Sequence, residues 1–164
     1  MIKQRTIKNQ VAIEGIGLQT GNKVRLNLKS SPVNSGINFI RLDLPNKPLL
    51  NIQSLSLESS NPASRRRTSL SLGPLEIQTI EHLMASIAGL SIDNVVIELD
   101  NIELPGLDGS AKDFLAALKR GGIVEQDAPK KVIKVEDVIW CEGQDNMLAV
   151  FPDDEFKISY TLSY

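Results

Sequence analysis

Short runs in which apolar and polar residues alternate fill the first third of the chain and restrict its possible folds. In such a run successive side chains point to opposite faces, which suits a β-strand with one buried face. Clusters of Gly, Pro, Asn and Ser separate the runs, as expected for turns. The runs are residues 23–29, 37–43 and 49–57. They predict antiparallel strands.

The middle of the chain adds a loop and further strands. Residues 59–69 are polar and rich in breakers, which predicts a loop. Residues 69–78 have strand character interrupted by a Gly-Pro turn, and the short, β-branched run 94–99 predicts a buried strand.

Two segments change to helical spacing. Residues 79–90 predict a helix because their apolar side chains recur every three or four residues, and Thr79 is the expected N-cap. A second helix is expected to start at Ser110 and to end at the glycines 121–122. The expected buried residues of the two helices are Ile80, Leu83, Met84, Ile87, Phe114, Leu115 and Leu118.

A charged, proline-containing stretch at residues 125–131 suggests a domain boundary near residue 128. We expect a first domain at 1–128 and the opening strands of a second at 129–164. The strand-like runs of the second are residues 132–140, 146–152 and 156–164. The predicted fold class is α+β, a two-layer sandwich of a mostly antiparallel sheet and two helices.

Composition excludes several classes of function. The net charge of −2 comes from mixed signs, so it gives no basic footprint for nucleic acid. No apolar run is long enough for a signal peptide or a membrane span, and a single cysteine, Cys141, fits a reducing compartment. We expect a soluble, cytoplasmic protein in which Cys141 is a packing residue.

The only histidine, His82, follows Glu81 at the start of the first predicted helix. At about 100° per residue, His82 lies about 200° from Ile80 and points away from the apolar stripe. The face that it shares carries the small residues Ala85, Ser86 and Gly89, which would allow close approach of a substrate, a metal or another domain.

Two interpretations of this pair remain open. His82 could ligate zinc while Glu81 acts as general base on the metal-bound water, because zinc lowers the pKa of that water to about 7. An exposed histidine beside a first-turn glutamate is the simpler interpretation. A catalytic zinc needs about three protein ligands, and the chain offers one histidine and one cysteine.

Other candidates have structural alternatives. Arg65, Arg66 and Arg67 could contact a diphosphate, but loop cations of this kind are often only solvated. Asp108, in an Asp-Gly turn, is interpreted as structural. The glycines at 15, 17 and 21 miss the dinucleotide-binding spacing and predict a tight turn instead.

Four segments, residues 2–7, 15–24, 79–99 and 103–114, resemble the UDP-3-O-acyl-N-acetylglucosamine deacetylases, the zinc enzymes of lipid A biosynthesis. The resemblance implies two similar domains, each a sandwich of sheet and helices, with Zn²⁺ and substrate between them. The chain resembles the first domain and the opening strands of the second.

Transferred residue by residue, the resemblance implies that Glu81 is the general base and His82 a zinc ligand. The family's other zinc ligands belong to its second half, so the chain would need a second domain from the same longer chain or from a separate polypeptide. Gln19 stands where the family usually has a histidine, and an amide cannot carry that charge.

The implied function is zinc-dependent hydrolysis of the N-acetyl group of UDP-3-O-acyl-N-acetylglucosamine. The chain would be the N-terminal part of the enzyme and inactive in isolation. The alternative is a non-catalytic half-protein that binds a nucleotide sugar or a partner.

Overall fold

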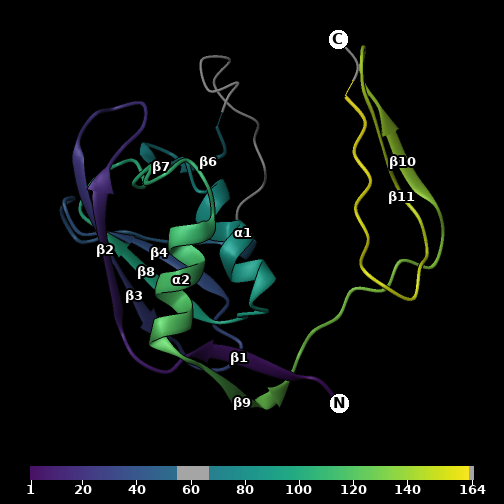
Figure 1. The fold of residues 1–164 in the computed structure, drawn as a ribbon, viewed down its shortest axis with the longest axis horizontal. Helices are drawn as coiled ribbons and strands as arrows, with labels where there is room; N and C mark the ends of the chain where they lie inside the picture. Colours follow the sequence, from purple (N-terminus) through teal and green to yellow (C-terminus); the bar gives the residue numbers. More distant parts are fainter. Residues whose placement is uncertain (55–66, 163–164) are drawn as a thin grey trace. The chain divides into compact units, whose positions relative to one another are not determined.

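A computed structural model describes residues 1–54 and 67–162 of the chain. The chain divides into two compact units, Met1–Lys130 and Lys131–Tyr164. The first unit contains a central sheet, two smaller strand pairs and both helices (Figure 1).

The central sheet of the first unit has five strands in the order β2-β3-β8-β4-β5. All neighbours pair antiparallel except β4 and β8, which run parallel. The prediction of a mostly antiparallel sheet is therefore confirmed. The strands are β2 (Val11–Ile16), β3 (Lys23–Ser30), β4 (Ile37–Arg41), β5 (Leu49–Asn51) and β8 (Val95–Leu99).

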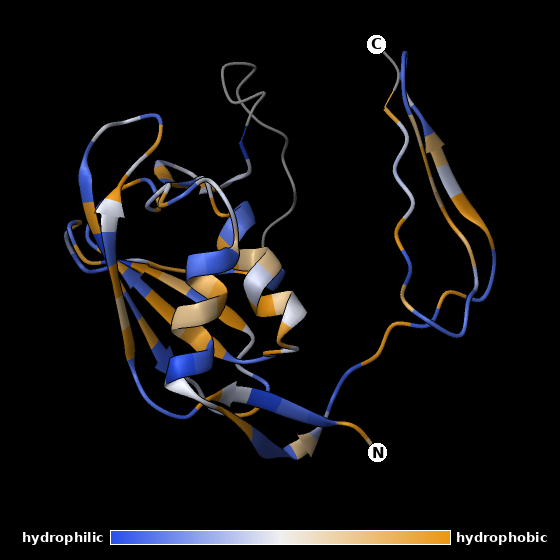
Figure 2. Cartoon of the chain, viewed as in Figure 1, coloured by the Kyte–Doolittle hydropathy of each residue, from blue (hydrophilic) through white to orange (hydrophobic). Residues whose placement is uncertain are grey.

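One face of this sheet is buried and the other carries polar residues. Along β3, Val24, Leu26 and Leu28 are buried, whereas Lys23, just before them, and Arg25, between Val24 and Leu26, are exposed. Figure 2 shows the resulting alternation of hydrophobic and hydrophilic residues along the strands. The period-two pattern thus places one apolar face against the helices.

The helices α1 (Glu81–Gly89) and α2 (Lys112–Gly121) form the second layer. Leu83 and Ile87 of α1 and Phe114 and Leu118 of α2 are fully buried in one hydrophobic core with the sheet residues. Figure 1 shows both helices on the same side of the sheet. This arrangement is the predicted α+β sandwich of two layers.

Two strand pairs flank the central sheet. β1 (Lys3–Ile7) pairs antiparallel with β9 (Ile123–Pro129), so the first and last strands of the unit are joined. β6 (Ser69–Leu72) and β7 (Leu75–Gln78) form a hairpin around the predicted Gly-Pro turn, where Gly73 has φ +57. A 3₁₀-helix, Ile52–Ser54, follows β5, where the sequence predicts a longer strand; residues 55–57 of that strand lie outside the described residues.

The predicted starts of both helices need correction. α1 begins at Glu81 with Ile80 at its N-cap position, and Thr79 does not cap it because the Thr79 hydroxyl donates to Glu103 instead. α2 begins at Lys112, not Ser110, although the Ser110 hydroxyl accepts a hydrogen bond of 3.1 Å from the Lys112 amide. The glycine at 122, with φ +76, ends α2 as expected.

The second unit contains one hairpin of β10 (Ile139–Glu142) and β11 (Met147–Val150). The strand predicted at 156–164 is wrong in its described part, residues 156–162, which form no strand. Cys141 is exposed, so its prediction as a packing residue is also wrong. A two-stranded hairpin has no second layer of its own in which to bury side chains.

Candidate functional site

Glu81 and His82 both lie in the first turn of α1, and each is half-buried. The Glu81 carboxylate accepts a hydrogen bond of 3.0 Å from the backbone amide of Thr68, just before β6. The free amides at a helix N-terminus also favour a negative charge at this position. The side chain of Glu81 is therefore held beside the β6–β7 hairpin.

The helix face expected to be open around His82 is only partly open. Ala85 and Gly89 are exposed, but Ser86 is 2 % exposed. The Ser86 hydroxyl lies 2.9 Å from the backbone oxygen of Ala111 and 3.1 Å from that of His82. Ser86 therefore packs against the start of α2, which explains why the helical projection alone placed it incorrectly.

A buried carboxylate, Glu103, lies between two segments of the candidate site and is 1 % exposed. One of its oxygens accepts hydrogen bonds of 2.8 Å from both the amide and the hydroxyl of Thr20, and the Gln19 amide donates to the carboxylate at 3.0 Å. Its other oxygen accepts a hydrogen bond of 2.8 Å from the Thr79 hydroxyl. Glu103 thus joins the turn that carries Gln19 to the residue two positions before Glu81.

The turn around Gln19 requires a glycine at position 17. A Cβ atom at Gly17 would lie 2.5 Å from a Glu103 carboxylate oxygen and 2.5 Å from the Thr20 hydroxyl. The amide of Gly17 donates to the Asn22 oxygen, and the Gly21 amide donates back to Gly17. The predicted tight turn is confirmed, and its close packing onto a carboxylate is the added finding.

The ionisation of Glu103 reflects two opposing effects. Burial alone would raise the pKa of Glu103, but hydrogen bonds from Thr20, Gln19 and Thr79 outweigh it and hold the pKa below the usual value of 4.5. The carboxylate is therefore charged at neutral pH, and that charge is satisfied by donors of the chain.

We expect this carboxylate to make stability depend on pH. Because the folded-state pKa lies below that of the unfolded chain, the stabilisation is complete above about pH 4.5 and is lost as the pH falls through the folded-state pKa. Glu103→Gln should cost about 2–4 kcal/mol at pH 7, since the Gln19 and Thr20 amides would face an amide nitrogen or lose a charged acceptor. The difference from wild type should shrink below pH 4.5.

Denaturant unfolding followed across pH 3–8, on the order of six points, measures this difference. Glu14→Gln is the matched control because Glu14 is exposed and forms its ion pair with the exposed Arg25. Its effect should remain small throughout. A Glu103→Gln penalty that is the same at every pH would contradict the role assigned to the charge.

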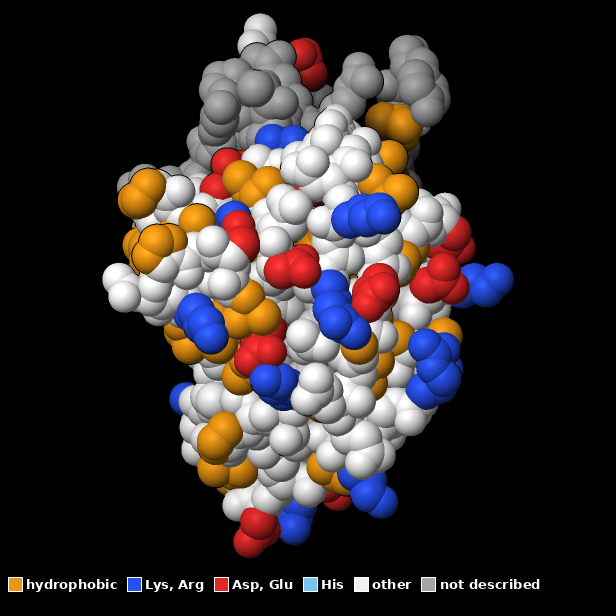
Figure 3. Space-filling view, turned by 90° about the vertical axis from the view of Figure 1, so that its left-hand side faces the viewer, with side chains coloured by type: hydrophobic (Ala, Val, Ile, Leu, Met, Phe, Trp, Pro, Cys, Tyr) orange, Lys and Arg blue, Asp and Glu red, His pale blue; other side chains and the backbone are white. Residues whose placement is uncertain are grey.

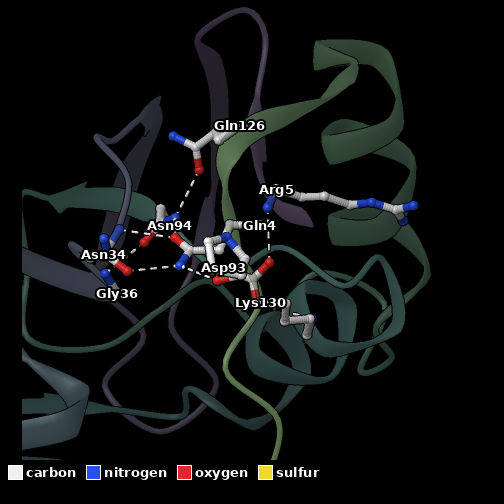
Figure 4. A network of polar contacts seen from close by, with 9 residues as sticks. Gln4, Arg5, Asn34, Gly36, Asp93, Asn94, Gln126 and Lys130 are labelled. Carbon is white, nitrogen blue, oxygen red and sulfur yellow. Dashed lines mark hydrogen bonds and ion pairs between the residues drawn. The ribbon is translucent and has the colours of Figure 1, made fainter. Parts of the chain in front are cut away.

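Asp93 and Asn94, which belong to the segment of resemblance at 79–99, connect distant parts of the chain (Figure 4). The Asn94 side chain is 1 % exposed; its nitrogen donates to the side-chain oxygens of Gln4 and Gln126, each at 2.7 Å, and its oxygen accepts from the Gly36 amide at 2.8 Å. Sequence reasoning did not identify this hub, because its partners are far apart in the sequence.

Asp93 extends the network to the end of the unit. Its carboxylate accepts a hydrogen bond of 2.8 Å from the Arg5 amide and forms an ion pair of 3.0 Å with Lys130. Figure 4 shows these contacts beside those of Asn94, so that β1, β9 and the loop before β8 meet at one point. Asp93 and Asn94 therefore tie the beginning of the first unit to its end.

The remaining candidates divide into structural and unplaced residues. Asp108 accepts hydrogen bonds from the hydroxyl and the amide of Ser110, which lower its pKa and fix the turn before α2. Arg65 and Arg66 lie outside the described residues. Arg67 is half-buried, and its Nε has no hydrogen-bond partner among the described residues.

The donor set for a metal is incomplete among the residues that the structure describes. Among residues 1–54 and 67–162, no three His, Cys, Asp or Glu side chains are grouped so that they could hold a metal ion. His82 is the only imidazole in the sequence, and Cys141 belongs to the second unit. The described residues therefore offer one good zinc ligand and do not by themselves fit a three-ligand centre.

The distribution of surface charge and the length of the helices concern two possible partners, nucleic acid and a membrane. Figure 3 shows a face of the molecule on which Lys and Arg side chains are interspersed with Asp and Glu side chains, in agreement with the mixed charge of the sequence. In the part of the chain that the structure describes, no helix is both long and apolar enough to cross a membrane.

Comparison with known proteins gives a consistent result. The family model of the UDP-3-O-acyl N-acetylglycosamine deacetylases matches residues 4–164. Proteins named UDP-3-O-acyl-N-acetylglucosamine deacetylase from Cellvibrio japonicus, Stenotrophomonas maltophilia and Pseudomonas entomophila are each 39% identical over 100% of this chain. The chain spans 53% of the length of each of these relatives. From residue 4 to its last residue, the chain belongs to the UDP-3-O-acyl N-acetylglycosamine deacetylase family.

Proposed function

We propose that this chain supplies the general base and one zinc ligand of a hydrolase that removes the N-acetyl group from UDP-3-O-acyl-N-acetylglucosamine in lipid A biosynthesis. The observation that carries the proposal is the Glu81–His82 pair in the first turn of α1, within a chain that belongs to this deacetylase family. We further propose that the protein acts in the cytoplasm, as expected from its single cysteine.

The proposed roles follow from the positions of the two side chains. Glu81 lies at a helix N-terminus, accepts one hydrogen bond from the Thr68 amide, and is only half-buried, so that its carboxylate can accept a proton from an attacking water. The adjacent His82 offers an imidazole nitrogen as a metal ligand. Zinc, when bound, would supply Lewis-acid activation of water and of the acetyl carbonyl.

The zinc ligands other than His82 are not among the grouped side chains of the described residues. The described residues present a single imidazole, and we propose that the remaining ligands come from a second domain, either later in the same longer chain or on a separate polypeptide. The share of each relative that lies beyond this match is large enough to hold such a domain. Glu81 and His82 would then complete the site from the first domain.

The substrate assignment is tested with the protein expressed from its complete gene. We expect acetate release from UDP-3-O-acyl-N-acetylglucosamine and at least about 100-fold slower release from UDP-N-acetylglucosamine, which lacks the acyl chain as a binding element. Binding of the nucleotide sugar without release of acetate would instead favour the non-catalytic module.

His82→Ala should lower zinc affinity by at least about 100-fold, because one of about three protein ligands is lost. Competition with a chromophoric chelator measures this affinity directly. Ala85→Gly, on an exposed position of the same helix, is the control for helix destabilisation and should leave zinc affinity within about threefold of wild type. Unchanged zinc binding in His82→Ala would remove His82 from the proposed site.

A further inference from the structure

Thr79 has an unusual backbone conformation directly before α1. Its φ is +59, which a β-branched residue seldom adopts because Cβ crowds the backbone. Such strain persists only where surrounding contacts hold it, and it often accompanies a functional constraint. Thr79 is 3 % exposed, and its hydroxyl donates to Glu103 at 2.8 Å.

The backbone on both sides of Thr79 is fixed to the segment that carries Glu103. The Gln78 amide donates to the Ile102 oxygen at 2.9 Å, and the Leu104 amide donates to the Gln78 oxygen at 3.1 Å. One residue after Thr79, the Ile80 oxygen accepts the first bond of the helix, from the Met84 amide at 2.9 Å. The direction in which α1 starts is therefore set where Gln78 and Thr79 contact residues 102–104.

Glu103 also fixes a second segment, the turn that carries Gln19. Its carboxylate accepts hydrogen bonds from the amides of Gln19 and Thr20 and from the Thr20 hydroxyl, and the lack of a side chain at Gly17 permits this close approach. One buried group thus sets both the turn at Gln19 and the backbone that leads into Glu81.

We propose that Glu103 and Thr79 are positioning residues, whose hydrogen bond holds the start of α1 so that Glu81 and His82 keep a fixed orientation relative to the Gln19 turn. This inference rests on the proposed function for its effect on turnover, but the contact itself belongs to the fold. Neither Glu103 nor Thr79 is proposed to contact the substrate.

The test removes the hydroxyl of Thr79 while keeping its shape. In the protein expressed from its complete gene, Thr79→Val should lower kcat by about tenfold or more with KM within about twofold, because a small misplacement of reacting groups is costly. Thr79→Ser keeps the hydroxyl and should recover kcat to within about threefold of wild type. Glu103→Gln should behave as Thr79→Val.

Thr6→Val is the matched control for the loss of a buried threonine hydroxyl. The Thr6 hydroxyl, in β1, donates to the backbone oxygen of Asn94 at 2.7 Å and accepts from the Ser31 amide at 3.2 Å, far in the sequence from the helix start. Thr6→Val should therefore lower stability at least as much as Thr79→Val and leave kcat unchanged. If Thr79→Val has the same kcat as Thr6→Val, positioning by Thr79 is excluded.

Hydrogen exchange separates this proposal from the proposed function. In substrate-free protein, exchange of the Met84 amide should rise at least about tenfold in Thr79→Val relative to the amides of β3, because the first turn opens locally. Thr6→Val should not change this ratio. If the ratio of Met84 to β3 exchange is unchanged in Thr79→Val, the positioning role is contradicted, even in a protein that shows no deacetylase activity. If the ratio rises but the protein shows no turnover, only the proposed function is contradicted.

Discussion

Replacing Glu81 by glutamine is expected to lower kcat for acetate release by about 10²–10⁴-fold, the usual contribution of a general base. Glutamine has the same shape, and its side-chain oxygen can still accept the hydrogen bond from the Thr68 amide. The variant therefore keeps the fold and loses only the ability to take a proton. KM and zinc affinity should stay close to those of wild type, because no ligand is removed.

Asp113→Asn is the control for this experiment. Asp113 is the exposed acidic residue in the first turn of α2, so its loss reproduces the change of charge at a helix N-terminus away from the proposed site. Its kcat should match that of wild type. Steady-state kinetics at neutral pH measure both variants, and a Glu81→Gln enzyme as fast as Asp113→Asn would exclude Glu81 as the base.

Asn94→Ala should destabilise the first unit by about 3–5 kcal/mol. The change leaves the buried Gly36 amide without its acceptor and the Gln126 oxygen without its donor. Gln4 cannot turn to compensate, because its side-chain nitrogen already donates to Asn34 and to the Pro129 oxygen. A penalty of this size is a large fraction of the stability of a typical domain.

Native-state hydrogen exchange of the buried amides in β3 and β8 measures this penalty for the first unit alone. Asn27→Ala is the control, since the Asn27 side chain accepts a long hydrogen bond of 3.4 Å from Gln10 at the surface. It should cost no more than about 0.5 kcal/mol. A loss below about 1 kcal/mol in Asn94→Ala would show that the network is not the hub described above.

Local patterns in the sequence were sufficient to predict the layers of the first unit. The alternation in residues 23–29 and the helical spacing from Ile80 to Ile87 predict which side of each element is buried. The structure confirms the buried side of both elements. Element ends were less accurate, as at Ser110, because hydrogen bonds of single side chains decide where a helix begins.

The strands of the second unit were overpredicted for a related reason. Residues 156–162 have strand-like composition, but composition supplies no partner, and a strand needs neighbours to satisfy its backbone groups. Cys141 is exposed although its strand is paired, because a two-stranded hairpin has no second layer to cover it.

The candidate site was predictable only in part. Glu81 and His82 stand out because one of them is the single histidine and both fall at a predicted helix start. Glu103 and Thr79 do not stand out, since their importance comes from a contact between residues 24 positions apart and from a backbone angle. No periodic pattern records either property.

The central claim is that the first turn of α1 contributes the base and one ligand of a zinc-dependent deacetylase. The most direct test measures acetate release from UDP-3-O-acyl-N-acetylglucosamine together with bound zinc, in protein expressed from its complete gene, before chelation, after chelation and after zinc is returned. We predict that turnover is lost with the metal and returns in proportion to the zinc that rebinds. Full acetate release from metal-free protein, or none from zinc-saturated protein, would contradict the claim.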